Sequence, residues 1–222
     1  MAVTSVVVLM STSAGAAPNG LTQIPIAKVY GDGVAAFSIS RSDLSAQSAT
    51  YTTQYGIDNR LEVGVDYQSA PADQRTFLGN AKYLVADNPG RLPDIAVGMT
   101  NVASGQRAVP YAVATTQPRA TGMSLGSIRS TTSHAYEGMA GVSYNVTPTL
   151  QVVSDYIEGG DAYGTVGIIA NLTPAITVNA AYCRPNSSDS PRGYAFNIAY
   201  TFHLISHESN RPSGQSKVSA SR

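Results

Sequence analysis

Ser133, His134 and Glu137 are the residues of this chain whose types and proximity most suggest catalysis. A hydroxyl beside an imidazole and a carboxylate is the arrangement that activates a serine nucleophile. Here all three lie in or beside a polar stretch, and their spacing matches no known nucleophile motif. We interpret them as part of a solvated loop, so the sequence predicts no catalytic residue.

A second group of candidate residues is acidic. Glu62, Asp66 and Asp155 fall on the polar side of alternating segments, where carboxylates are suited to hold a cation or a sugar. Such groups more often pair with a base, and Lys82 or a nearby arginine is the expected partner. The single cysteine, Cys183, excludes an intramolecular disulfide and a cysteine-built metal site. No cofactor and no metal site is predicted.

These polar groups must lie on β-strands, because apolar and polar residues alternate along most of the chain. The clearest case is residues 193–204, where alternate positions form one apolar face: Tyr194, Phe196, Ile198, Tyr200, Phe202 and Leu204. Successive side chains of a strand point to opposite faces. A wholly apolar face with aromatic rings near both ends is suited to crossing a bilayer, which takes about 9–11 tilted residues.

Composition narrows the class of protein. Charged residues make up 13% of the 222 residues, against about 25% in typical soluble domains. No apolar run approaches the roughly 18 residues of a membrane helix. These two facts leave a membrane barrel or a Ser/Thr/Gly-rich soluble β protein. Acidic and basic residues are equal in number, so no nucleic-acid partner is expected.

Alternating segments and turn residues together predict about twelve strands within residues 33–204. Tyr51–Tyr67 forms a hairpin around a central turn, whereas residues 109–117 and 121–129 alternate weakly. An even number of strands leaves the first and the last strand with their free ends on the same side of the membrane, as in bacterial single-chain barrels. The predicted fold class is all-β: a closed up-and-down antiparallel transmembrane β-barrel.

An internal repeat supports this topology. Asn145–Val152 reads Asn-Val-Thr-Pro-Thr-Leu-Gln-Val, and Asn171–Val178 reads Asn-Leu-Thr-Pro-Ala-Ile-Thr-Val. Tyr156 and Tyr182 keep the same offset from the two copies. A repeat of this length corresponds to one up-and-down pair of strands, which is the unit of a meander that closes on itself.

The two faces of the predicted strands have different expected surroundings. We expect the apolar face, which includes the six residues of 193–204 named above, to contact lipid. We expect the polar face to line a lumen, with these residues among its lining: Glu62, Asp66, Asn80, Lys82, Asp155, Asn179 and Asn197. A soluble secreted barrel that binds an apolar ligand is the alternative, and it would place the apolar face inward.

The chain divides into four predicted parts. Residues 1–16 resemble the apolar and cleavage-site regions of a secretory signal peptide, without its basic region. Residues 17–32 lead into the barrel, residues 33–204 form it, and residues 205–222 are predicted to be a disordered polar tail.

Short motifs of the chain resemble the YjbH-like outer-membrane barrel proteins associated with exopolysaccharide loci. The resemblance rests mainly on the turn Asn145–Leu150, on Ser154-Asp155-Tyr156 and on Pro191–Tyr194, with similarity also at Gly20–Pro25 and in the hairpin. It implies a barrel in the outer membrane, and polysaccharide secretion is its functional extension. Members of that family are anchored through an N-terminal cysteine, whereas the one cysteine of this sequence is Cys183, so this anchor is not expected here.

The sequence therefore predicts a bacterial outer-membrane barrel that acts as a narrow channel or an export scaffold. A passage that is small or plugged is expected from the strand number. Expected partners are membrane lipid, the barrel-assembly machinery, and polysaccharide or small solutes. A barrel enzyme that modifies outer-membrane lipid or glycan is the second alternative, and the porin-like channel is preferred to it.

Overall fold

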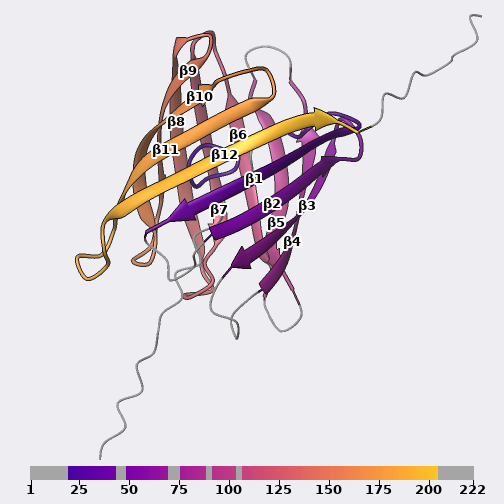
Figure 1. Cartoon of the computed structure of the whole chain (residues 1–222). Helices are drawn as coiled ribbons and strands as arrows, with labels where there is room; N and C mark the ends of the chain where they lie inside the picture. The colour runs from indigo at the N-terminus through magenta and orange to yellow at the C-terminus, as the bar shows by residue number, and fades with distance from the viewer. Residues whose placement is uncertain (1–19, 44–48, 70–75, 89–91, 104–106, 205–222) are drawn as a thin grey trace, which may run out of the picture.

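In the computed structural model, which describes residues 20–43, 49–69, 76–88, 92–103 and 107–204, the strands close into one antiparallel barrel (Figure 1). Each strand pairs with its neighbours in the chain, and β1 pairs with β12 to close the ring. The twelve strands are β1 Val34–Ser42, β2 Ala49–Gly56, β3 Leu61–Ser69, β4 Thr76–Ala86, β5 Asp94–Val102, β6 Val109–Thr116, β7 Thr121–Arg129, β8 Tyr136–Thr147, β9 Leu150–Ile157, β10 Tyr163–Asn171, β11 Ile176–Pro185 and β12 Gly193–His203. The predicted fold class and strand number are confirmed.

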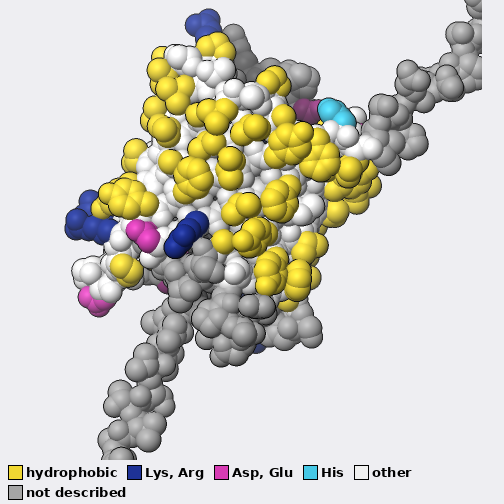
Figure 2. Space-filling model, viewed as in Figure 1, with side chains coloured by type: hydrophobic (Ala, Val, Ile, Leu, Met, Phe, Trp, Pro, Cys, Tyr) yellow, Lys and Arg dark blue, Asp and Glu magenta, His cyan; other side chains and the backbone are white. Residues whose placement is uncertain are grey.

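Alternation of residue type decides which way each strand faces. In β12, Tyr194 and Phe196 are 66% and 49% exposed on the outside, whereas Ala199 on the opposite face is buried. Apolar side chains cover much of the outer surface in the same way (Figure 2). The arrangement is the reverse of a soluble barrel, whose apolar side chains point inward.

The internal repeat gives the same turn twice. Thr147 Oγ1 accepts hydrogen bonds from the amides of Thr149 and Leu150, at 3.2 and 3.0 Å. Thr173 Oγ1 does the same for Ala175 and Ile176, also at 3.2 and 3.0 Å. The hydroxyl therefore fixes both tight reversals, at the connections from β8 to β9 and from β10 to β11.

The two rims of the barrel differ. The "turn end" carries the connections 57–60, 87–93, 117–120, 148–149 and 172–175, together with the start of β1 and the end of β12. The "loop end" carries the other six connections, from 43–48 to 186–192. Connections at the turn end are shorter on the whole, and their side chains make many of their own hydrogen bonds. Asp58 Oδ1, for example, accepts from the amides of Arg60 and Leu61 at 2.6 and 2.7 Å.

Strand β6 explains why part of the sequence alternates weakly. Val109, Tyr111 and Val113 point inward and are buried, while Ala112 on the other face is exposed. Both faces are thus apolar, and the contrast on which sequence periodicity depends is lost. This apolar inner wall implies that something apolar occupies the lumen beside it.

The occupant is the chain itself. Residues 20–33, here called the inner segment, lie inside the barrel, where they are visible behind β12 and β1 in Figure 1. The segment predicted to lead into the barrel is therefore folded within it from Gly20 onward. Residues 1–16 and 205–222, predicted to be a signal peptide and a tail, fall outside the described residues. No helix among the described residues is long and apolar enough to cross a bilayer.

Candidate functional site: the lumen and its inner segment

The inner segment begins with a tight turn that is held by one carboxylate. The Leu21 amide donates to the Ile24 carbonyl at 3.0 Å, and Gly20 forms a β-bridge with Pro25. The amides of Thr22 and Gln23 at the tip of this turn donate to Asp155 Oδ2 of β9, at 2.7 and 2.9 Å. Hydrogen bonds to a charged acceptor are worth about 1.5–3 kcal/mol each. Asp155 is 3% exposed and is thus committed to holding the turn.

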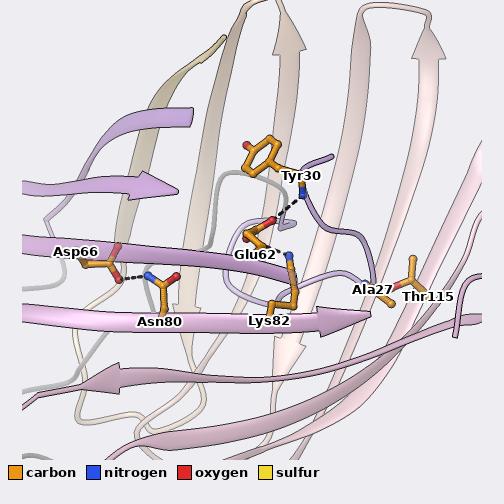
Figure 3. A network of polar contacts seen from close by, with 7 residues as sticks. All are labelled: Ala27, Tyr30, Glu62, Asp66, Asn80, Lys82 and Thr115. Atoms are coloured by element: carbon orange, nitrogen blue, oxygen red, sulfur yellow. Dashed lines mark hydrogen bonds and ion pairs between the residues drawn. The ribbon is translucent and has the colours of Figure 1, made fainter. Parts of the chain in front are cut away.

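Further hydrogen bonds fasten the segment along its length (Figure 3). The Ala27 amide donates to Thr115 Oγ1 of β6 at 2.8 Å, and the Tyr30 amide donates to Glu62 Oε2 of β3 at 2.9 Å. Asn179 Nδ2 of β11 donates to the Leu21 carbonyl at 3.4 Å. Since β3, β6, β9 and β11 are spread around the wall, the segment crosses the lumen and does not merely line one side of it.

Apolar packing adds to this attachment. Leu21, Ile24 and Ala27 are buried to 6%, 0% and 0% exposure, in one cluster with inward side chains of β4 to β9. The wall residues of that cluster are Leu84, Ala96, Val109, Tyr111, Val113, Ile128, Met139, Val153 and Ile157. Burying a Leu or Ile side chain contributes about 1.5–3 kcal/mol. The lumen is therefore two-sided, with an apolar half that binds the inner segment and a polar half lined by β12 and β1 to β3.

The acidic residues predicted to line the lumen are separated from one another by their partners. Lys82 Nζ lies 3.6 Å from Glu62 Oε1, and both side chains are almost wholly buried. Asp66 instead accepts a hydrogen bond from Asn80 Nδ2 at 3.3 Å. No cluster of three or more His, Cys, Asp or Glu suited to a metal occurs among the residues that the structure describes. The arrangement gives no cation cage, and it uses Glu62 and Asp155 to hold the chain's own backbone.

The remaining predicted residues lie as follows. Asn179 and Asn197 are partly buried on the inward faces of β11 and β12, where they oppose each other in the strand register. Ile198 and Tyr200 are exposed on the outer face, and Phe202 stacks on Tyr200 with ring centroids 5.5 Å apart. Leu204 lies just beyond β12 and is 57% exposed. Cys183 is buried on the inward face of β11.

A single glycine tests how tightly the inner segment fits. A Cβ on Gly141 of β8 would lie 2.5 Å from Leu21 Cδ1 and 2.6 Å from Ile24 Cδ1. We expect Gly141→Val to lower the free energy of unfolding by about 1–3 kcal/mol, since overpacking forces neighbouring side chains to move. Urea unfolding in detergent micelles measures this. Leu21→Ala in the same chain should restore part of the loss, and Gly160→Ala, whose Cβ would meet nothing within 4 Å, serves as the control. Equal stability of Gly141→Val and the wild type would contradict the packing.

A cavity of about 260 Å³ opens at the loop end. Arg107, Arg129 and His134 line it together with Asn101. His134 and Asn101 both have a positive φ, of 60° and 58°, a conformation uncommon outside glycine. Two arginines make this mouth basic, in contrast to the middle of the lumen.

The same loop shows how the candidate catalytic residues are arranged. Ser133 Oγ donates to Glu137 Oε1 at 3.2 Å, and the His134 backbone carbonyl accepts from Arg129 Nε at 3.3 Å. In an activated serine the hydroxyl donates to the imidazole, whereas here it donates directly to the carboxylate. The Ser133 and Glu137 side chains and the His134 carbonyl thus stabilise the loop, and the arrangement lacks the geometry of a serine nucleophile and its imidazole base.

Nothing in the sequence marks Thr115 as a partner of the inner segment or predicts the apolar half of the lumen. The bonds of the inner segment join residues far apart in the chain, such as Gln23 with Asp155, and no local pattern reports them. One signal was present, because Leu21, Ile24 and Ala27 recur at every third position. In the fold they share a cluster with β6, whose residues alternate only weakly in the sequence.

Fold and lumen together define an inside-out β-barrel of twelve strands, with an apolar exterior and a partly polar interior that its own residues 20–33 occupy. Among solved structures, the chain is similar to the KdgM porin, with a TM-score of 0.56, 13% sequence identity and coverage of 77% of this chain and 99% of that one. It is also similar to the NanC porin, with a TM-score of 0.52, 10% identity and coverage of 77% and 100%. A structure of the KdgM porin in complex with disordered oligogalacturonate matches at a TM-score of 0.56 and 12% identity.

No family model matches the sequence, and no curated protein matches it. At these identities the porin structures establish the shared fold alone, a closed antiparallel β-barrel. The more specific YjbH-like resemblance stays a prediction.

Proposed function

We propose that this protein is an outer-membrane β-barrel that forms a narrow channel, which the inner segment keeps closed in the state described here. The observation that carries the proposal is the inverted distribution of side chains. Apolar residues such as Phe77, Leu125 and Tyr194 are at least 60% exposed on the outside, while Glu62, Lys82 and Asp155 are at most 3% exposed inside. Only a bilayer around the barrel makes both placements favourable.

The two rims support an orientation. Bacterial outer-membrane barrels have short periplasmic turns and longer extracellular loops, and the chain enters the first strand and leaves the last strand on the periplasmic side. The turn end, where β1 begins and β12 ends, is accordingly proposed to face the periplasm, and the loop end the cell exterior. This location requires export, so a signal peptide remains part of the proposal.

Charge inside the lumen favours one class of solute. Among the described residues the buried charged side chains are Glu62, Asp66 and Asp155 against Lys82, an excess of acid. Small neutral or cationic solutes suit such a passage better than polyanions. Oligogalacturonate, with which the KdgM porin was solved, is an acidic sugar chain, and here only the basic mouth at Arg107 and Arg129 would favour it.

Three measurements test the proposal. The full chain should fractionate with the outer membrane, migrate on a gel in a heat-modifiable way, and show only small or rare conductance steps in a planar bilayer. Recovery from the periplasm without detergent would overturn the membrane location and restore the soluble alternative. A correctly folded barrel that never conducts, even under high voltage, would remove the channel and leave a scaffold.

The scaffold is the second candidate, and the occupied lumen is the observation that favours it. Polysaccharide export, predicted from the YjbH-like resemblance, needs a wider passage than a lumen crossed by its own chain, and it therefore depends on displacement of the inner segment. The enzyme alternative has less support, because the Ser133 hydroxyl donates to the Glu137 carboxylate and not to the imidazole of His134. Replacing Ser133 and His134 should accordingly leave the membrane lipid profile unchanged.

A further inference from the structure

The outer wall of the barrel has a groove that the lumen does not explain. It has a volume of about 550 Å³, within the range of ligand sites. Small residues of β10 to β12 form its floor, and larger apolar side chains form its sides. The lining includes Gly167, Ala180 and Ala195, with Ile168, Tyr182 and Phe196 beside them. We call this feature the wall groove.

Arginines stand at the loop end of the wall groove. Arg184 is two residues beyond Tyr182 on the same face of β11, and Arg192 is two residues before Tyr194. Two residues of a strand span about 7 Å. Arg41 of β1 pairs with Phe196 in the strand register. All three arginines are exposed, and Figure 2 shows basic side chains gathered at this rim, next to the apolar surface.

The guanidinium groups are available for a ligand. None of the three makes a hydrogen bond or an ion pair with another described residue. Two acids lie nearby, and both are engaged: Asp43 Oδ1 accepts from the Tyr194 amide at 2.6 Å, and Asp189 Oδ1 accepts from Ser188 Oγ at 3.2 Å. These neutral donors leave both carboxylates charged, so three arginines against two acids give the rim a net charge of +1 directly beside an apolar groove.

We propose that the wall groove binds one lipid of the surrounding bilayer, with an acyl chain along the small-residue floor and an anionic phosphate headgroup held by Arg41, Arg184 and Arg192. Arginine is suited to this role because its planar fork binds phosphate through two parallel hydrogen bonds. Tyr182 and Tyr194, whose ring centroids are 5.6 Å apart, lie between the acyl-chain part and the headgroup part of this site. Amphipathic rings are enriched at this level, where the bilayer meets water. The lipid belongs to the outward-facing leaflet, since the loop end is proposed to face the exterior.

Charge complementarity decides between a lipid and a second copy of this chain. A second copy would bring the same three arginines to a symmetric contact, where like charges repel. A lipid supplies the opposite charge, and the groove is continuous with the apolar surface that the bilayer covers. This inference rests on the proposed membrane location, but it does not depend on conduction.

The test measures lipid binding by native mass spectrometry of the full chain released from detergent micelles. Dioleoyl phosphatidylglycerol is titrated against dioleoyl phosphatidylcholine, which has the same chains and no net charge. A basic residue near an anionic surface is worth about 1 kcal/mol, so each of Arg41→Gln, Arg184→Gln and Arg192→Gln should weaken phosphatidylglycerol binding about fivefold, and the triple variant roughly 100-fold. Binding of phosphatidylcholine, whose choline offsets the charge of its phosphate, should be weaker in the wild type and should fall less in these variants.

Two further variants complete the test. Arg60→Gln with Arg119→Gln removes the same kind of charge at the turn end and should leave binding unchanged. Ala180→Phe fills the floor of the groove and should weaken binding of both lipids. Heat-modifiable migration verifies that each variant is folded, and the single arginine variants remain informative if the triple variant fails to fold.

Three results would overturn the inference. The first is unchanged phosphatidylglycerol binding in folded arginine variants. The second is an equal loss of binding in the turn-end control. The third is conversion of a dimer to a monomer by Ala180→Phe without any effect on lipid, which would assign the groove to a second copy. Absence from the outer membrane would remove this inference together with the proposed location, whereas a lack of conductance would leave it intact.

Discussion

Replacing residues 20–29 with a Gly-Ser linker of equal length is expected to increase single-channel conductance several-fold. The replaced residues cross the lumen and bond to three separate parts of its wall, so their removal frees the cross-section that they occupy. The wall should survive, because each strand is paired with both neighbours without help from the segment. Planar-bilayer recording measures the conductance, and heat-modifiable migration shows that the barrel has folded.

The opened channel should also select for cations. Asp155 would lose its hydrogen bonds from Thr22 and Gln23, and it would face the lumen as a carboxylate that only Thr165 Oγ1 of its present partners still holds. Reversal potentials in a salt gradient measure this preference, which Asp155→Asn in the linker variant should reduce.

A milder substitution distinguishes opening of the channel from damage to the barrel fold. Asp155→Asn in the otherwise intact chain keeps an acceptor for the turn but removes its charge, so brief openings should become more frequent. Asp161→Asn, an exposed acid at the loop end, is the matched control and should behave like the wild type. If the folded linker variant conducts no more than the wild type, the inner segment is not what closes the passage.

The strands could be predicted from the sequence because their information is local. In β12 the bilayer favours apolar side chains outside and the lumen favours polar side chains inside. The neighbouring residues Phe196 and Asn197 therefore already indicate which face is the outer one and which is the inner one. Turn chemistry is local as well: Thr147 and Thr173 bond to amides two and three residues later. Both kinds of signal lie within a few residues of the position that they determine.

The occupied lumen could not be predicted, because its information is not local. The tip of the inner segment bonds to Asp155, more than a hundred positions away in the sequence, and its apolar side chains pack on strands from β4 to β9. The partner of Asp155 in the inner segment is therefore invisible until the barrel closes, whereas its other partner, Thr165, lies opposite it in the hairpin of β9 and β10. Glu62 and Lys82 form an intermediate case: they are directly opposite in the register of β3 and β4, so the pair follows once that hairpin has been assigned.

Lys82→Met is expected to destabilise the barrel by about 3–5 kcal/mol, because it leaves the Glu62 carboxylate buried without its counter-ion. Both side chains are at most 3% exposed, and the Lys82 ammonium lies 3.6 Å from the Glu62 carboxylate. The Tyr30 amide donates to the other oxygen of Glu62, so the inner segment should be loosened as well. Urea unfolding followed by heat-modifiable migration measures the first effect, and bilayer recording measures the second.

The double variant Glu62→Gln with Lys82→Met distinguishes an unpaired charge from lost packing. The glutamine removes the buried charge but keeps an acceptor for the Tyr30 amide, so the double variant should recover more than half of the lost stability. Asn80→Ala, on the same strand as Lys82, removes a neutral donor to the Asp66 carboxylate and should cost only about 2 kcal/mol. A loss below this value in Lys82→Met would mean that water or a third group already compensates Glu62. In that case the ion pair would not be what anchors the turn end of the inner segment.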